Sequence, residues 1–115
     1  MKIKSFTFNP FQENTFIIYD RTKECMIIDP GFYEEDEKNE FISFIKRNKL
    51  NPTKLVNTHC HIDHILGNSS VIQKWKLNIN LHKEELKMLE NAPEIAKIYG
   101  FSNYIHSDKK ISLIE

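Results

Sequence analysis

The sequence is organised around one stretch, Thr58-His59-Cys60-His61-Ile62-Asp63-His64-Ile65-Leu66-Gly67-Asn68. Four side chains that can bind a metal ion fall close together in it: His59, His61, Asp63 and His64. Imidazole nitrogen and carboxylate oxygen are both good ligands for zinc and similar divalent ions. A cluster of this polarity is costly to bury without a metal or dense hydrogen bonding. The stretch therefore predicts a metal site.

The spacing of these four residues predicts that they form two pairs whose side chains point in different directions. In extended backbone His59 and His61 point to the same side, so both rings can converge on one ion. Asp63 and His64 follow where a strand gives way to a helix, and the turn can aim them at a neighbouring ion. Two adjacent ions can hold a bridging hydroxide and polarise a carbonyl. Cys60 is expected to point the opposite way, although a role as ligand or nucleophile stays open.

Upstream of this stretch the pattern predicts strands and one helix. Three β-prone runs precede it, each ended by a turn signal: residues 3–8, 15–19 and 25–28. The third ends on Asp29-Pro30-Gly31. Acidic residues at 34–37 and basic residues further on complement the dipole of a helix over 34–49. The acidic run could instead bind a metal or a partner. A short buried strand at 54–57 leads into the histidines.

Downstream the pattern predicts alternating helices and strands. A helix over 65–76 carries Trp75, whose ring fits core packing better than a ligand platform. Strands are expected at 77–81 and 111–114, with an amphipathic segment over 83–90 between them. Residues 91–94 look like a capping box that opens a last helix reaching Gly100. Strands and helices that alternate in this order indicate an α/β layered domain.

The motif then points to a known family. The pattern His59-x-His61-x-Asp63-His64, with a strand before it and Gly67-Asn68 after it, resembles the signature of the metallo-β-lactamase superfamily. The segment Asn9-Pro-Phe-Gln-Glu-Asn14, followed by two strands and Asp29-Pro-Gly31, resembles the glyoxalase II-like hydrolases of that superfamily. The likeness covers the whole chain. The motif is specific for the superfamily and much less specific for the substrate.

The resemblance implies a fold as well as a site. We expect class α/β (α+β layered): the N-terminal half of an αβ/βα sandwich, with a mixed sheet and helices on one face. Residues 1–115 then form a single, truncated domain of this kind. A half-sandwich leaves a sheet face or edge unpaired, which favours self-association. A separate chain that supplies the second half is the alternative.

The resemblance also assigns roles. His59 and His61 would bind a first metal, and Asp63 and His64 a second. Asp63 would be the catalytic residue as well, placed to orient the nucleophilic hydroxide or take its proton. Asp29 would orient the ligands from behind. The expected cofactor is Zn²⁺, as one or two ions, with Fe or Mn as alternatives.

The family pattern includes three further ligands that this chain lacks. They are a third histidine for the first metal, a bridging aspartate and a last histidine for the second. A catalytic zinc usually has three protein ligands. His82 and His106 do not replace them: His82 suits a helix cap or a surface position, and His106 has no motif around it.

Composition excludes several classes of function. The chain has 115 residues, of which 40 % are hydrophobic and 28 % charged, as in folded globular domains. Sixteen Lys and Arg balance sixteen Asp and Glu, which argues against a nucleic-acid partner and against a basic membrane-surface domain. Neither a signal peptide nor a membrane-spanning segment is evident. The two isolated cysteines, Cys25 and Cys60, favour a reduced, cytoplasmic protein.

The leading prediction is therefore a metal-dependent hydrolase of the metallo-β-lactamase superfamily. By resemblance, a metal-bound hydroxide would hydrolyse a small-molecule thioester or ester, such as an acylated glutathione. One alternative is a non-catalytic metal-binding or interaction module that uses the same histidines. Another is an iron-dependent sulfur dioxygenase of the same superfamily, with one metal at His59 and His61.

Overall fold

A computed structural model describes residues 1–108 and 110–114 of the chain. Its elements follow one another as a sheet interleaved with helices: β1 (Lys2–Phe8), β2 (Glu13–Tyr19), β3 (Glu24–Ile28), α1 (Glu35–Arg47), β4 (Asn51–Val56), α2 (Ile62–Ile65), α3 (Asn68–Trp75), β5 (Ile79–His82), the 3₁₀ turn η1 (Lys83–Glu85), α4 (Leu86–Glu90), α5 (Ala92–Ile98) and β6 (Ile111–Ile114). This mixed α/β architecture confirms the predicted fold class.

The strands form one six-stranded sheet in sequence order, β1-β2-β3-β4-β5-β6. The first three pair antiparallel as a meander, and β3 to β6 pair parallel. Helices return the chain between parallel strands, as such crossovers require. All of the predicted strands are confirmed.

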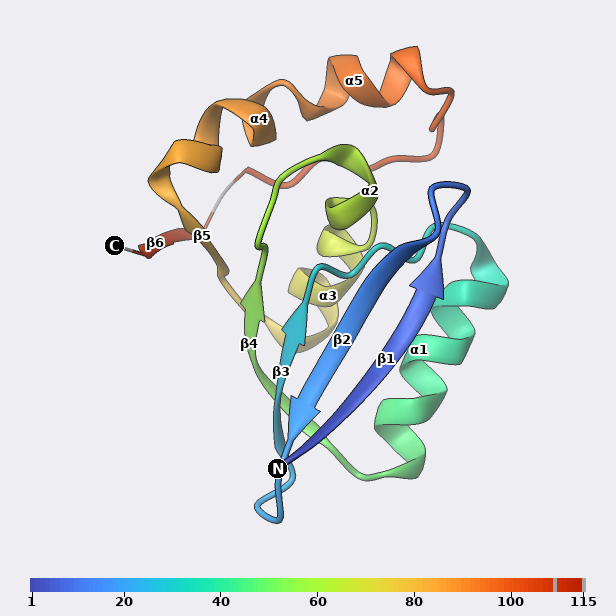
Figure 1. The fold of residues 1–115 in the computed structure, drawn as a ribbon, viewed down its shortest axis with the longest axis vertical. Coiled ribbons are helices and arrows are strands. Elements are labelled where there is room, and N and C mark those ends of the chain that lie inside the picture. The colour runs from blue at the N-terminus through green and yellow to red at the C-terminus, as the bar shows by residue number, and fades with distance from the viewer. Residues whose placement is uncertain (109, 115) are drawn as a thin grey trace.

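The sheet has one face packed against helices. In Figure 1, α1 and α3 lie behind β1 to β4, whereas α4 and α5 cross the end of the sheet. Alternate residues of each strand point toward the helices and form a row that runs across neighbouring strands: Ile17, Ile27, Leu55 and Ile79, each 0 % exposed. Trp75 packs against this core, as predicted.

The ends of α1 and α5 follow local chemistry. At α1 the Glu37 carboxylate accepts hydrogen bonds from the backbone N–H groups of Tyr33, at 2.8 Å, and of Asn9, at 2.7 Å. The helix therefore also anchors the β1–β2 loop. At α5, Gly100 takes φ of 78°, and the Phe101 N–H donates to the Ala96 carbonyl at 2.8 Å. This is a Schellman end, for which a left-handed glycine is the usual residue.

Two predictions about helices were wrong. Residues 65–76 do not form one helix, because the chain breaks at Gly67 between α2 and α3. The Gly67 N–H donates to the Pro30 carbonyl at 2.7 Å, and a Cβ at this position would collide with the Phe32 ring. The capping box at 91–94 is also absent. Asn91 accepts hydrogen bonds from the N–H groups of Glu94 and Ile95 through its backbone carbonyl, and its side chain makes no cap.

No helix within residues 1–108 and 110–114 is both long enough and apolar enough to cross a bilayer.

Candidate metal centre

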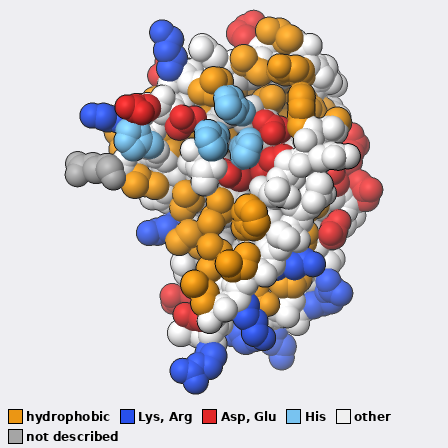
Figure 2. Space-filling model, in the orientation of Figure 1, with side chains coloured by type: hydrophobic (Ala, Val, Ile, Leu, Met, Phe, Trp, Pro, Cys, Tyr) orange, Lys and Arg blue, Asp and Glu red, His pale blue; other side chains and the backbone are white. Residues whose placement is uncertain are grey.

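The candidate site lies at one end of the sheet. Because β3 and β4 are parallel, Asp29 and the histidine motif follow these strands at the same end of the sheet. Strand β2 runs the opposite way, so its first residue, Glu13, begins at that edge too. The carboxyl ends of parallel strands are the usual place for ligands in open α/β sheets. Figure 2 shows the histidines gathered at this end with acidic side chains between them.

The three imidazoles of the motif lie together. The rings of His59 and His61 are parallel within 3°, with centroids 5.7 Å apart. The His64 ring lies 5.6 Å from that of His59 and 6.4 Å from that of His61. Asp63 Oδ2 is 3.6 Å from His64 Nε2. The structure thus brings all four predicted ligands into one cluster, although their binding of a metal stays a prediction.

Cys60 points away from this cluster, as its alternation with two exposed histidines predicts. It is 1 % exposed, and its backbone N–H donates to Glu85 Oε1 at 2.9 Å. Burial raises the pKa of the thiol to about 12, so the thiolate that binds metals or attacks carbonyls is scarce at neutral pH. This environment gives no support to Cys60 as ligand or nucleophile.

Asp29 holds the base of the site together. It takes φ of 52°, a left-handed conformation that Asp tolerates better than most residues. Its carboxylate accepts hydrogen bonds from the Thr58 N–H, at 2.8 Å, and from the Thr58 hydroxyl, immediately before His59. Its Oδ2 also lies 3.1 Å from His64 Nδ1. These contacts agree with the orienting role that the resemblance implies for Asp29.

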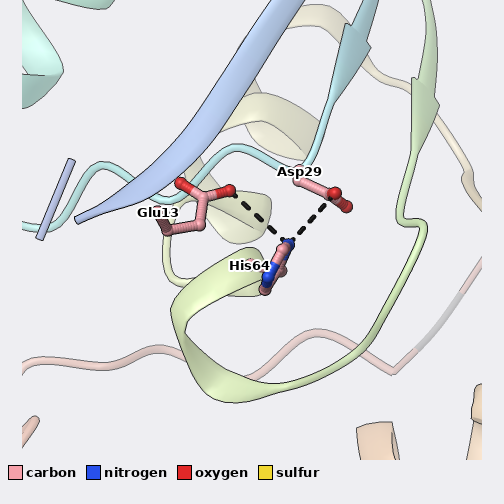
Figure 3. A group of neighbouring side chains, drawn as sticks. All are labelled: Glu13, Asp29 and His64. Atoms are coloured by element: carbon pink, nitrogen blue, oxygen red, sulfur yellow. Dashed lines mark ion pairs between the residues drawn. The ribbon is translucent and has the colours of Figure 1, made fainter. Parts of the chain in front are cut away.

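Glu13 is the second carboxylate behind His64 (Figure 3). It is 4 % exposed, and its Oε1 lies 3.7 Å from His64 Nδ1. Burial raises the pKa of Glu13 to about 8. The Asp29 carboxylate, within hydrogen-bonding reach, raises the pKa of His64 as well. Yet among the described residues neither Glu13 Oε1 nor His64 Nδ1 has a well-aligned hydrogen-bond partner.

The backbone is fitted closely around Glu13. A Cβ on Gly31 would collide with the Glu13 carboxylate and the Asp63 carbonyl, so only glycine fits there. Asn9 reaches across from the β1–β2 loop, and its Nδ2 donates to the carbonyls of Gly31, at 2.9 Å, and Asp63, at 3.0 Å. The Thr15 hydroxyl lies 2.9 Å from Glu13 Oε2. Three loops distant in sequence are thereby fixed relative to one another.

Glu13, Asn9 and Thr15 were not among the predicted site residues. One signal for Glu13 was present in the sequence, because it stands in phase with Thr15 and Ile17 along β2. Residues in that phase point toward the core, where an unpaired carboxylate is rare. A charged residue in the buried phase of a strand is a sign of function.

Two arrangements could hold a cation, and they share His64. Glu13, Asp29 and His64 bring three potential ligand atoms within 4.8 Å of one another. The second arrangement is the motif itself, reached through His64 Nε2. A ligating histidine usually turns its other ring nitrogen toward a carboxylate, which fixes the ring and raises its basicity. With Nδ1 facing Glu13 and Asp29, Nε2 is the nitrogen left for a divalent ion, and Asp63 Oδ2 lies 3.6 Å from it.

The remaining histidines serve elsewhere. His82 Nδ1 accepts a hydrogen bond from the Glu84 N–H at 3.1 Å, which confirms its expected helix-cap position. His106 Nδ1 lies 2.8 Å from the Tyr104 hydroxyl, and its Nε2 lies 3.7 Å from Asp108 Oδ2. Neither belongs to the cluster around His64.

Comparison with known proteins gives a consistent picture. The family model described as "Metallo-beta-lactamase superfamily" matches residues 8–110. The "Probable metallo-hydrolase YqgX" of Bacillus subtilis is 34 % identical over 93 residues, which cover 80 % of this chain and 41 % of that protein. The "Hydroxyacylglutathione hydrolase GloC" of Haemophilus influenzae is 34 % identical over 104 residues, covering 90 % and 47 %.

Solved structures agree on the fold. The BLEG-1 B3 metallo-beta-lactamase superposes with a TM-score of 0.80 at 27 % identity, over 99 % of this chain and 53 % of that one. The protein TTHA1623, described in a di-iron-bound form, gives a TM-score of 0.83 at 23 % identity, over 97 % and 54 %. The chain thus spans about half the length of these relatives.

Proposed function

This chain belongs to the metallo-β-lactamase superfamily, and from that premise we propose that its histidine cluster binds zinc and serves in the hydrolysis of a small-molecule thioester. Two relatives carry the word hydrolase in their names, and hydroxyacylglutathione, named for one of them, is a thioester. Those names support the class of reaction for this chain.

One observation carries the proposal. His64 has Nδ1 directed at two buried carboxylates, with Asp29 at 3.1 Å and Glu13 at 3.7 Å, while Nε2 lies 3.6 Å from Oδ2 of Asp63, another candidate ligand. Burying two carboxylates against an imidazole is unfavourable unless a positive charge compensates them. The raised pKa values of Glu13 and His64 show that protonation compensates the carboxylates in part, and a cation held by the outer nitrogen would supply further positive charge.

Each residue of the cluster then has a task. His59, His61, Asp63 and His64 are the proposed ligands, and Zn²⁺ is the ion proposed, with Fe or Mn as alternatives. A bound divalent ion acts as a Lewis acid toward the substrate carbonyl and lowers the pKa of water. The Asp63 carboxylate, 23 % exposed, is open enough to orient the attacking water and accept its proton. That proton is then available to the departing thiolate.

The rest of the site keeps this geometry rigid. Asp29 holds the Thr58 backbone directly before His59, and Asn9 holds the Asp63 carbonyl. Because the candidate ligands are braced from buried positions, little ordering is needed when an ion binds. An ion with only two protein ligands retains open positions for water and substrate.

The test is metal binding and thioester hydrolysis on the same preparation. We expect the purified chain to take up about one equivalent of zinc or more, measured by calorimetry and metal analysis. His61→Ala should weaken zinc binding by about tenfold or more. His106→Ala is the matched control, because His106 lies outside the cluster, and it should bind as the original chain does. Hydrolysis of the lactoyl and benzoyl thioesters of glutathione is followed on the zinc-loaded proteins.

The outcomes separate the candidate functions. Hydrolysis that exceeds that of His61→Ala supports the proposed enzyme. Zinc binding without such hydrolysis supports a non-catalytic metal-binding module instead. A chain that takes up neither zinc, iron nor manganese contradicts both.

A further inference from the structure

An apolar pocket of about 210 Å³ adjoins the candidate metal centre. It shares His61 and Asp63 with the cluster, and its apolar wall is formed by Phe11, Met88, Ile95 and Tyr99. These wall residues come from the β1–β2 loop, from α4, and from the middle and C-terminal cap of α5. Any group bound in the pocket would therefore lie beside two of the proposed ligands.

The wall contains aromatic surface that core packing does not explain. The Phe11 and Tyr99 rings meet edge to face, with centroids 5.2 Å apart and planes at 88°. Their side chains nevertheless remain 46 % and 57 % exposed. Exposed apolar side chains gathered in a hollow beside a polar site are typical of ligand-binding pockets.

The position of Phe11 is fixed before any ligand arrives. Its backbone N–H donates to Asn9 Oδ1 at 2.9 Å, and the Gln12 N–H donates to the Asn9 carbonyl at 3.0 Å. The same Asn9 side chain holds the Gly31 and Asp63 carbonyls. One residue thus sets both the aromatic wall and the loop that carries Asp63, which keeps the distance between pocket and cluster constant.

The side chains that line the pocket favour an uncharged occupant over an anionic one. Among the described residues that line it there is no Lys or Arg, and Asp63 is acidic. The glutathionyl part of a glutathione thioester carries carboxylates, for which the wall of the pocket offers no cationic side chain. An uncharged apolar group fits this lining better.

We propose that this pocket holds the apolar acyl group of the substrate, of about the size of a phenyl ring or a six-carbon chain, with the thioester carbonyl directed at the cluster. The proposal rests on the proposed hydrolase function and names its substrate class. Its size argument is direct, since apolar cavities of about 150 Å³ are known to bind benzene. Acyl groups as small and hydroxylated as lactoyl would leave the apolar wall uncovered.

The three methionines of the chain allow a direct binding test. Met88 lines the pocket, whereas Met1 and Met26 line a separate hollow. With methyl-labelled methionine, NMR titration with benzyl alcohol should shift the Met88 signal in a saturable way and leave Met1 and Met26 nearly unchanged. Propane-1,2-diol, which has the carbon skeleton of lactate, should not shift Met88 at equal concentrations. Both probes are uncharged and are compared for contact with the apolar wall, so the titration is carried out on the metal-free protein.

Two variants of α5 provide the control. Ile95→Asn, in the pocket wall, should raise the dissociation constant for benzyl alcohol by about fivefold or more, because apolar contact is lost. Ile98→Asn lies on the same helix at a side chain that is 76 % exposed and outside the lining, and should change it less than about twofold. Equal shifts at Met26 and Met88, or no effect of Ile95→Asn, would overturn the proposal. A Met88 shift caused by glutathione instead would assign the pocket to the leaving group.

Failure of this proposal differs from failure of the proposed function. Benzyl alcohol binding at Met88 without thioester hydrolysis retains the pocket and rejects the enzyme. Hydrolysis that proceeds equally well with benzoyl and lactoyl thioesters, without binding at Met88, retains the enzyme and rejects the pocket.

Discussion

Two neighbouring rows of the sheet show how differently its faces are used. The row Ile17, Ile27, Leu55 and Ile79 faces the helices and is 0 % exposed at each position. One residue away in register lies the row Phe16, Ile28, Val56 and Asn80, whose side chains are half-buried. Within the described residues no helix covers this second face, and Figure 2 shows apolar side chains gathered on it below the histidines.

The difference in composition between the two faces indicates that the second face is suited to contact with other protein. A sheet face exposed to water normally carries polar residues in alternation with the core. Here most of the uncovered row is apolar, as on the inner face of a two-sheet sandwich. We therefore expect this face to associate with further protein, and the self-association expected from the sequence is one form of that contact. The four predictions below test the contrast between the faces, from the largest expected effect to the smallest.

Adjacent isoleucines of β3 give the sharpest test. Ile27→Ala should lower the free energy of unfolding by about 4 kcal/mol, because it opens a cavity under the helices. Ile28→Ala, on the uncovered face, should cost about 1 kcal/mol. Denaturant unfolding followed by circular dichroism measures both. Equal losses would show that the two faces are equally packed in solution.

Cys25 and Met26, the preceding pair of residues in β3, extend the contrast between the two faces to chemical reactivity. Cys25 is 3 % exposed, and burial raises the pKa of its thiol from 9.0 to about 11. At pH 8 the thiolate fraction falls about a hundredfold, so maleimide should label Cys25 slowly, and faster as the pH rises. Met26, on the uncovered face, should be oxidised readily by dilute peroxide.

Peptide mapping by mass spectrometry reads both modifications in one sample. Urea-unfolded protein is the control, and its Cys25 should react at the rate of a free thiol. Rapid labelling of Cys25 in the native protein would mean that the covered face opens easily.

Gly31 tests how tightly the covered side closes around the site. Gly31→Ala places a methyl group against Glu13 and the Asp63 carbonyl, and should cost about 2 kcal/mol of stability and weaken zinc binding. Gly100→Ala has open space around it and should cost about 1 kcal/mol, from its φ of 78° alone. Calorimetry with zinc and thermal unfolding separate the effects. Unchanged zinc affinity in Gly31→Ala would contradict the close coupling of Gly31 to the cluster.

Association through the uncovered face is the smallest expected effect. Ile18→Lys should lower the tendency of the chain to self-associate, as seen by sedimentation velocity over a range of concentrations, because it charges the apolar surface. Ile98→Lys, at an exposed position on α5, serves as control and should leave association unchanged. Association that persists in Ile18→Lys would place the contact elsewhere, for example at the edge strand β6.

Much of the fold could be predicted from local pattern. Strand alternation and the charges of α1 depend on residues that are neighbours in sequence, so the strands and that helix were predicted. The break at Gly67 was missed because it depends on the approach of Phe32 and Pro30 from a distant loop. The capping box at 91–94 was wrong for the opposite reason: the residue types suit it, but the backbone of Asn91 already continues from α4.

The residues of the candidate site also divide into those that local sequence predicts and those that depend on distant contacts. His59, His61, Asp63 and His64 were predicted because their spacing is local and their chemistry is distinctive. Glu13 was missed because its one local signal, a carboxylate in the buried phase of β2, does not by itself indicate a metal site. Only the pairing of β2 with β3 brings it to Asp29, and only the turn into α2 brings His64 to both.

By itself, then, the sequence determined which residues are the candidates for metal binding, which strands form and which family the chain resembles. All of these depend on residue type and short spacing. The tertiary structure alone decided which nitrogen of His64 meets buried carboxylates, that an apolar pocket adjoins His61, and that no helix of residues 1–108 and 110–114 covers the second sheet face. The reason is physical: these properties arise from contacts between segments far apart in the chain, and such contacts exist only once strand register and helix packing have fixed the distances.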